Sequence, residues 1–286
     1  MKADLKADLH CHTHYSDGKH AVSFLVERAL ENGVTHLAIS DHDCTSALSG
    51  LEAVEGLSFI RGVEISCSWE QMELHIVGLC IDPSNVALQQ LLREQQTKRL
   101  DRVVKMDQKL EALGTKGLLA SLQDSHAIAL TRSHVADFLV DHKVCKTRQK
   151  AFKTHLNKQG KMYVSSDWCS LEQGVAAIKN AGGIAVIAHP GRYPLNRTKL
   201  RRLVESFKTM GGDALEASYP HIAPSMQQDL EKLCVEFGLY VSCGSDFHDA
   251  EAHWTDVGKF PPLASNVEEH AVWHHPIWMN QVGEDR

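Results

Sequence analysis

Histidine and acidic residues recur together in short motifs along most of the chain. Eighteen of the 286 residues are histidines, an abnormally high number that suggests a metal site. Imidazole and carboxylate groups in combination suit Mn, Fe or Zn better than Ca or Mg. These residue types therefore predict a transition-metal site, provided that the fold brings the motifs together. The motifs are DLHCH at 8–12, DHD at 41–43, GVEIS at 62–66, ELH at 73–75, AHPGR at 188–192 and GSDFH at 244–248.

The number of candidate ligands indicates more than one metal ion. Taken alone, an H-x-H motif such as His10 and His12 on a strand is more often structural than metal-binding. Nine candidates in several motifs are too many for one ion and suit two or three, with Glu64 as a natural bridging carboxylate. Clustered divalent ions are suited to phosphate-ester hydrolysis, because they deprotonate a water molecule, orient the phosphate and stabilise the leaving oxygen.

The motifs lie at the ends of apolar runs that are typical of strands. Strands are expected near 7–9, 36–40, 57–65, 74–79, 184–188, 214–217 and 239–243, and helices near 21–32, 171–181, 198–210 and 225–237. This alternation, with glycines after the helices, predicts an α/β fold with a parallel sheet. Seven strands could close into a barrel, and the carboxyl ends of its strands would then form the rim that carries the active site.

The segment 84–163 interrupts this alternation. It contains a long, charge-rich helical pattern over 88–110 and further helical patterns at 133–141 and 150–156. We therefore expect one barrel domain, formed by residues 1–83 and 164–286, with a helical insertion at 84–163. The segment after Asp256, rich in Pro, His and Trp, is expected to close the barrel or to be loosely ordered.

Composition narrows the class of protein. Apolar residues make up 43% and charged residues 23%, as in ordinary globular proteins, and the net charge of −6 disfavours indiscriminate binding to nucleic acid. No run of 18 apolar residues exists to span a membrane, and no cleaved signal peptide is expected. Eight cysteines without a C-x-x-C pair are expected to be reduced thiols of a cytoplasmic protein. Because alternate strand residues face opposite sides, Cys11 should pack and not bind metal beside His10 and His12.

Taken together, the motifs at 10–12, 41–43, 62–65, 188–192 and 244–248 resemble the PHP (polymerase and histidinol phosphatase) family. The resemblance covers nearly the whole chain. It implies a distorted seven-stranded β/α barrel with three divalent metal ions, Mn first and Fe or Zn as alternatives. The family pattern places His10, His12, Glu64 and Asp246 at the first ion, Asp17, His42 and His248 at the second, and Glu64, His75 and His189 at the third. No expected ligand is missing, and Glu64, His10 and Asp246 are expected to be catalytic.

Further motifs narrow this resemblance. ELHIVGL at 73–79 and TRSHVADFL at 131–139 are similar to the RNase AM subgroup of the family. The similarity implies a hydrolase that is a 5′–3′ exoribonuclease in ribosomal RNA maturation and that removes the 3′-phosphate of nucleoside 3′,5′-bisphosphates. The implied partners are 5′-phosphorylated RNA ends and these bisphosphates. In both substrates water attacks phosphorus and the nucleoside 3′-oxygen leaves, so one site could serve both, selected by a pocket for the terminal 5′-phosphate.

Arginine suits the recognition of such a phosphate through paired hydrogen bonds. We expect Arg132 and Arg192, each adjacent to a motif, to bind the 5′-phosphate, and His134 and His20 to contact the substrate. The alternatives are a salt bridge on the barrel rim for the two arginines and a helix-capping or core position for His134.

A basic stretch at 142–161 contains six lysines and one arginine but no acidic residue. It is either a solvated face or a track for an RNA backbone. Tyr163 and Trp168 could stack on a base, although burial is the commoner role for such residues. Asp41 and Asp43, next to candidate ligands, are expected to support them.

Three functions remain open. The first is the nuclease and 3′-phosphatase described above. The second is a PHP phosphatase of a small phosphomonoester such as histidinol phosphate, in which the basic insertion has no role. The third is a non-enzymatic metal-binding or polymerase-accessory barrel. The complete ligand set disfavours the third, and the TRSH motif at 131–134 with the basic stretch favours the first over the second.

Overall fold

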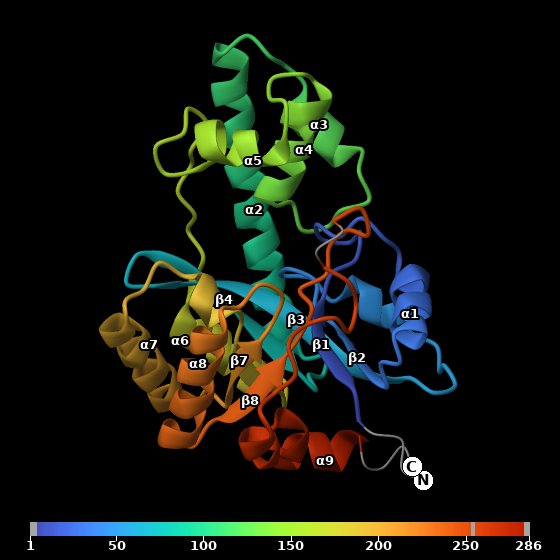
Figure 1. Ribbon diagram of the computed structural model, residues 1–286. Helices are drawn as coiled ribbons and strands as arrows, with labels where there is room; N and C mark the ends of the chain where they lie inside the picture. Colours follow the sequence, from blue (N-terminus) through green and yellow to red (C-terminus); the bar gives the residue numbers. More distant parts are fainter. Residues whose placement is uncertain (1–4, 253–254, 283–286) are drawn as a thin grey trace.

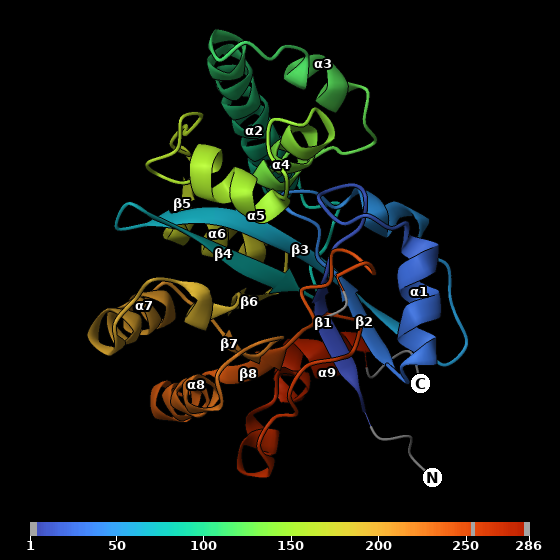
Figure 2. The same cartoon turned by 45° about the horizontal axis from the view of Figure 1, so that its top comes forward.

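Seven strands of the described residues form a nearly closed barrel (Figures 1 and 2). The computed structural model describes residues 5–252 and 255–282. A bridge between Cys11 and Phe247 narrows the gap between the first and last strands. Cys11 itself is buried in an apolar cluster and is not among the candidate ligands, as expected. The strands, in hydrogen-bonded order, are β1 (Ala7–Cys11), β2 (His36–Ile39), β3 (Ser58–Trp69), β4 (Met72–Leu79), β6 (Ile184–Ile187), β7 (Ala214–Ser218) and β8 (Tyr240–Cys243), and a short β5 (Cys169–Ser170) pairs with β3.

The sheet is mixed, so the prediction of a parallel sheet is wrong at β4. This strand runs antiparallel to both of its neighbours, β3 and β6. A parallel crossover needs a dozen or more residues, whereas Glu70 and Gln71, both with positive φ, join β3 directly to β4 in a hairpin. Because β4 starts at the rim where the parallel strands end, His75 near its start can still reach the predicted site.

Four predicted helices cover the outside of the barrel (Figure 2). They are α1 (Val22–Glu31), α6 (Leu171–Asn180), α7 (Arg197–Thr209) and α8 (Pro224–Phe237). Each buries an apolar face; in α7 this face includes Leu200, Leu203 and Phe207, at the spacing of an amphipathic helix. Ser170 and Gln173 form a capping box that starts α6. The helices α6, α7 and α8 share one large apolar core with β3, β4, β6, β7 and β8, whereas α1 packs against β1 and β2 in a separate cluster.

The insertion stands over the rim as a group of helices (Figure 1). It comprises α2 (Val86–Ala112), α3 (Leu118–Gln123), α4 (Arg132–Asp141), α5 (Arg148–Ala151) and a π-helical turn, η2 (Phe152–Leu156). The helices predicted over 88–110, 133–141 and 150–156 are present, whereas the short α3 was not predicted. Leu110, Leu118 and Phe138 belong to a core of the insertion's own. Leu88 and Leu92, in the first turns of α2, pack into the barrel core and anchor the insertion.

The end of the described chain closes the barrel on the side opposite the insertion (Figure 1). Val272 and Trp278 are buried together with Ala7 and Leu9 of β1. Of the two expectations for this segment, barrel closure is the one observed. The elements there are η4 (Ser265–His270), η5 (Val272–His274) and α9 (Pro276–Val282). Over the two described ranges, no helix combines the length and the apolar character needed to cross a membrane.

Candidate metal centre

All nine predicted ligands meet at the rim of the barrel beneath the insertion. Their donor atoms fall into four overlapping groups, and within each group the atoms lie within 4.8 Å of one another. The groups are His12–Asp17–His42–His248, His10–His189–Asp246, His10–His12–Glu64 and His42–Glu64–His75. The predicted convergence is observed. Only the third group, however, stays within one ion of the family pattern; the other three each join side chains that this pattern distributes over two ions.

Glu64 of β3 lies at the centre of this arrangement and is fully buried. Burial alone would raise the pKa of Glu64, but the charges of nearby histidines, His42 and His75 first, hold it well below its usual value. An ionised carboxylate that contacts so many imidazoles has the surroundings expected of a bridging ligand. Nitrogens of His10, His12, His42, His75 and His189 lie 2.9–3.3 Å from its oxygens.

The pKa values of five imidazoles of the centre are shifted, upward for His10, His42 and His248 and downward for His12 and His75. Burial opposes protonation of His10, but carboxylates around it, Glu216 first, raise its pKa well above the usual value. Burial likewise opposes protonation of His248, but the charge of Asp17 raises its pKa to about 9. Burial and the charge of His248 lower the pKa of His12 to about 3. Divalent cations entering the centre must therefore displace protons, which weakens their binding at low pH.

Several buried polar atoms of the centre lack a hydrogen-bond partner. In the described ranges these include Asp17 Oδ1, His189 Nδ1, His42 Nδ1 and Glu64 Oε2, the last two 2.9 Å apart but without hydrogen-bond geometry. His10 Nε2 and His12 Nε2 also face each other at 3.1 Å. Buried polar groups are normally paired, and this donor set is the one that Mn, Fe or Zn prefers. The residues present fit divalent cations.

Three ligand loops contain a non-glycine residue with left-handed backbone. Asp43, His189 and Asp246 have φ angles of 43°, 33° and 47°. Such conformations cost about 1–3 kcal/mol each and persist where the surroundings impose them, often at functional sites. Asp43 is held by Arg99 of α2, whose Nε donates to Asp43 Oδ2 at 2.8 Å, and by the Ser66 backbone N–H, which donates to Oδ1 at 3.0 Å. Through Arg99, the insertion thus stabilises the loop that follows β2. Asp43 receives this contact and lies next to His42, where a supporting role was expected of it.

Sequence reasoning missed three buried charged residues around the centre. Glu216 interrupts the apolar run of β7, and this contrast is the signal that could have identified it. Arg99 and Arg102 lie on the buried face of α2, among its apolar residues. Charges on a helix are usually solvated, so their burial is evident only once α2 is seen to pass over the rim.

A cavity of about 270 Å³ opens above the metal centre. Arg132 and Arg192, the predicted phosphate ligands, both line it. Arg132 shares the carboxylate of Glu73 with Arg102, each at 3.1 Å. Arg192 pairs with Asp246. Both arginines therefore make the salt bridges that were the alternative reading, and both also face the cavity. Four arginines line it in all among the described residues: Arg99, Arg102, Arg132 and Arg192.

Two predicted substrate residues are not among those that line the cavity. His134 Nδ1 accepts a hydrogen bond from the Thr131 N–H at 2.9 Å and completes the capping box of α4. Burial lowers the pKa of His134, in keeping with a neutral acceptor. His20 stacks on Phe24, with 3.9 Å between ring centroids, and accepts a hydrogen bond from the Ala250 N–H at 3.0 Å. The helix-capping alternative is the contact observed for His134, and substrate binding by either histidine stays a prediction.

Aromatic rings occupy one wall of the cavity. Trp168 is buried, with the guanidinium carbons of Arg99 and Arg102 4.9 and 5.5 Å from its ring centroid. Phe152 of η2 is half-buried and also lines the cavity. Trp168 therefore has the core role that was the commoner expectation, but at the edge of the site. Phe152, which the sequence did not single out, is the more accessible of the two rings.

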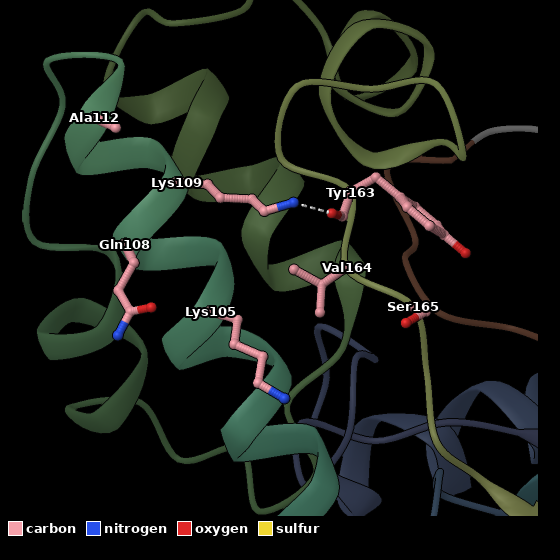
Figure 3. A pocket seen from close by; sticks show the side chains of 7 residues that line it. All are labelled: Lys105, Gln108, Lys109, Ala112, Tyr163, Val164 and Ser165. Atoms are coloured by element: carbon pink, nitrogen blue, oxygen red, sulfur yellow. Dashed lines mark hydrogen bonds between the residues drawn. The ribbon is translucent and has the colours of Figure 1, made fainter.

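Basic side chains are exposed on the insertion. The lysines of the stretch 142–161 are all exposed, whereas Arg148 pairs with Asp137 at 2.8 Å. A second hollow, of about 550 Å³, lies between α2 and the segment 163–165, and Lys105 and Lys109 line it (Figure 3). None of the residues that line it belongs to the candidate ligand groups. Figure 3 also shows that the ring of Tyr163 points away from this hollow.

Comparison with known proteins identifies the class. The family model of the PHP domain matches residues 8–159, more than half of the chain. The chain therefore belongs to the PHP family, as its motifs predict.

Two curated relatives cover nearly the whole chain. The chain is 38% identical over 283 residues to the 3′,5′-nucleoside bisphosphate phosphatase of Chromobacterium violaceum, covering 95% of this chain and 94% of that protein. It is 38% identical over 281 residues to the 5′–3′ exoribonuclease Rnm of Escherichia coli, covering 95% and 93%. A solved structure of an amidohydrolase from C. violaceum, with bound sulfate and no metal, superposes with a TM-score of 0.86 at 36% identity, covering 94% and 95% of the two chains.

Proposed function

We propose that this protein is a metal-dependent phosphoesterase with two related activities. It releases 5′-mononucleotides from 5′-phosphorylated RNA as a 5′–3′ exoribonuclease, and it removes the 3′-phosphate of nucleoside 3′,5′-bisphosphates. The observation that carries this proposal is the convergence of nine candidate metal ligands next to a cavity that seven of them line together with four arginines. The two curated relatives, named as a 3′,5′-nucleoside bisphosphate phosphatase and a 5′–3′ exoribonuclease, support it. An intracellular site of action is part of the proposal, because all eight cysteines are free and buried.

The proposed centre holds three divalent ions, with Mn the first to test. Glu64 would be shared, and the other eight ligands would complete the positions in the combinations that their donor atoms form. Ions bound there would supply a water molecule that ionises near neutral pH and positive charge for the phosphate oxygens. The chain's own contribution is to fix the donors on strand ends of a rigid barrel.

The reaction joins a water oxygen to phosphorus and breaks the bond to the nucleoside 3′-oxygen, which takes up a proton. The cavity arginines can bind the rest of the nucleotide. Arg132 presents its guanidinium at the start of α4, where Ser133 also lines the cavity. Within the part of the chain that the structure describes, the Arg132 guanidinium hydrogen-bonds to Glu73 alone, so a phosphate can take up its other donors. A 5′-phosphate held there would leave the 3′-phosphorus over the metal centre. Residues 84–163 would thus act as a unit on the substrate-binding side.

The test compares substrates that differ at one end. Purified, Mn-loaded protein is offered the same oligoribonucleotide with a 5′-phosphate and with a 5′-hydroxyl, and separately a nucleoside 3′,5′-bisphosphate and histidinol phosphate. We expect mononucleotides from the 5′-phosphorylated strand only, together with release of the 3′-phosphate from the bisphosphate. Equal turnover of both strands, or activity confined to histidinol phosphate, would reject the proposal.

Replacement of Arg132 by alanine should weaken substrate binding without loss of metal. A hydrogen bond to a charged group contributes about 1.5–3 kcal/mol, so KM for the bisphosphate should rise about ten- to hundredfold. The measurement is steady-state kinetics with metal content determined on the same samples. Arg197→Ala on α7 is the control, since Arg197 is exposed and pairs with Asp229 away from the cavity. A fall in metal content of Arg132→Ala would show that this arginine supports the centre instead.

Neutralising the basic stretch should affect long RNA more than a mononucleotide. Lys150 and Lys153 are exposed and lie next to Phe152 at the cavity wall. If both contact phosphates, Lys150→Gln with Lys153→Gln should lower the salt dependence of RNA binding by about 1.4 in log–log slope, because each contact to a single strand contributes about 0.7. Fluorescence anisotropy measures this; Lys199→Gln with Lys232→Gln on the outer helices is the control. If the double variant loses affinity equally for RNA and for the bisphosphate, the basic stretch is not a track for the RNA backbone.

A further inference from the structure

Two buried carboxylates stand directly behind the candidate ligands. Glu216 of β7 is 2% exposed and Asp41, after β2, is 1% exposed. Neither belongs to a group of side chains whose donor atoms could hold a metal ion among the described residues. Both instead accept hydrogen bonds from candidate ligands or from residues next to them in the sequence. The two carboxylates do so on different sides of the centre.

Glu216 connects two ligands that come from different strands. His10 Nδ1–H of β1 donates to Glu216 Oε1 at 3.0 Å, and the His189 backbone N–H, after β6, donates to Oε2 at 2.6 Å. A carboxylate only accepts, so His10 donates from Nδ1, and Nε2, once it has lost its proton, is the atom that can bind an ion. At His189 the same carboxylate fixes a left-handed backbone. His10, His189 and Asp246 form one of the four donor groups.

Asp41 serves the other side of the centre. Its Oδ1 accepts from the Thr13 N–H at 2.8 Å and from the Ser16 hydroxyl at 2.6 Å, and its Oδ2 accepts from the Thr13 hydroxyl at 2.6 Å. These three bonds fix the turn between His12 and Asp17. Both of these belong to the donor group that also contains His42 and His248.

We propose that Glu216 and Asp41 are positioning residues that control two different ion positions independently. The inference rests on the proposed metal centre and assigns one supporting carboxylate to each of two ion positions. Glu216 organises the position held by His10, His189 and Asp246, and Asp41 organises the position held by His12, Asp17, His42 and His248. Their contacts do not overlap: in the described chain, no side-chain hydrogen bond of one carboxylate reaches a member of the other's group. Loss of such an outer partner typically lowers metal affinity ten- to hundredfold.

The experiment is a crossed pair of substitutions in the full chain. Glu216→Gln and Asp41→Asn preserve shape but replace an acceptor oxygen by an amide donor. Crystals of each variant are equilibrated at limiting Mn²⁺, and anomalous scattering gives the occupancy of each position, while calorimetry on the chelated protein gives affinities. We expect Glu216→Gln to lose occupancy at the His10–His189–Asp246 position and Asp41→Asn to lose it at the other, each with a ten- to hundredfold weaker binding event.

The control is Glu231→Gln on α8, a buried carboxylate that accepts from the Ala264 N–H at 3.1 Å, far from the centre. Its Mn²⁺ binding should equal that of the unsubstituted protein. Glu216→Asp, which keeps the charge but shortens the reach, should show the same selective loss and provides a second variant if the first is too unstable. Unchanged occupancies, or equal loss at both positions in each variant, would overturn the inference while leaving the proposed activity intact. Unsubstituted protein that binds no ion would overturn both.

Discussion

Replacement of Glu64 by glutamine is expected to reduce turnover of both proposed substrates by about a thousandfold or more. Glu64 is the carboxylate closest to the greatest number of candidate ligands, so its loss affects every ion position that it shares. Stabilisation by bound divalent ions amounts to several kcal/mol, and each 1.36 kcal/mol is tenfold in rate. The loss should be accompanied by fewer bound ions per chain, measured by elemental analysis after dialysis against Mn²⁺.

The control for this substitution is again Glu231→Gln, which removes a buried carboxylate outside the centre. It should retain activity and metal content. Glu64→Gln with normal turnover would contradict the bridging role that its five imidazole contacts indicate. Loss of turnover with a full complement of ions would instead make Glu64 a residue that acts on the substrate or the water.

Much of the barrel could be predicted because its signals are local. Apolar runs bounded by glycine and followed by amphipathic patterns predict strands and helices whatever their partners. Strand direction is not local, and β4 is where the prediction fails. The few residues between the runs at 57–65 and 74–79 are too short for a crossover helix. The length of that connection, and not the composition of either run, was the evidence for a hairpin.

The ligands themselves could be predicted because metal chemistry restricts residue type. His, Asp and Glu at several strand ends predict a metal site before any coordinates are known, and all nine candidates do converge. The supporting residues could not be found in this way. Glu216 and Arg99 acquire their roles from what packs against them, and the sequence does not state which strand lies beside β7 or which loop lies beneath α2.

Arg99 is expected to show the largest effect on stability of any single substitution in the insertion. It is 5% exposed, and its guanidinium donates to Asp43 Oδ2, to the Leu130 carbonyl at 3.1 Å and to the Ser66 hydroxyl at 2.7 Å. Arg99→Met would leave the carboxylate of Asp43 buried without its cation. Breaking a buried ion pair from one side costs about 3–5 kcal/mol, a large part of the stability of an ordinary domain. Urea denaturation of the chelated protein measures this directly.

Arg201→Met is a matched control because Arg201 has the same two kinds of contact at the surface. It pairs with Glu236, and its guanidinium carbon lies 4.9 Å from the ring centroid of Phe237, as that of Arg99 lies 4.9 Å from the ring centroid of Trp168. Half of each partner's side chain in the Arg201 pair is exposed, so water replaces the lost interaction and stability should stay near that of the unsubstituted protein. Adding Asp43→Asn to Arg99→Met should recover part of the lost stability, because the buried charge of Asp43, unpaired in Arg99→Met, is then removed. If Arg99→Met unfolds at the same urea concentration as Arg201→Met, the contact between α2 and the loop after β2 does not hold the insertion on the barrel.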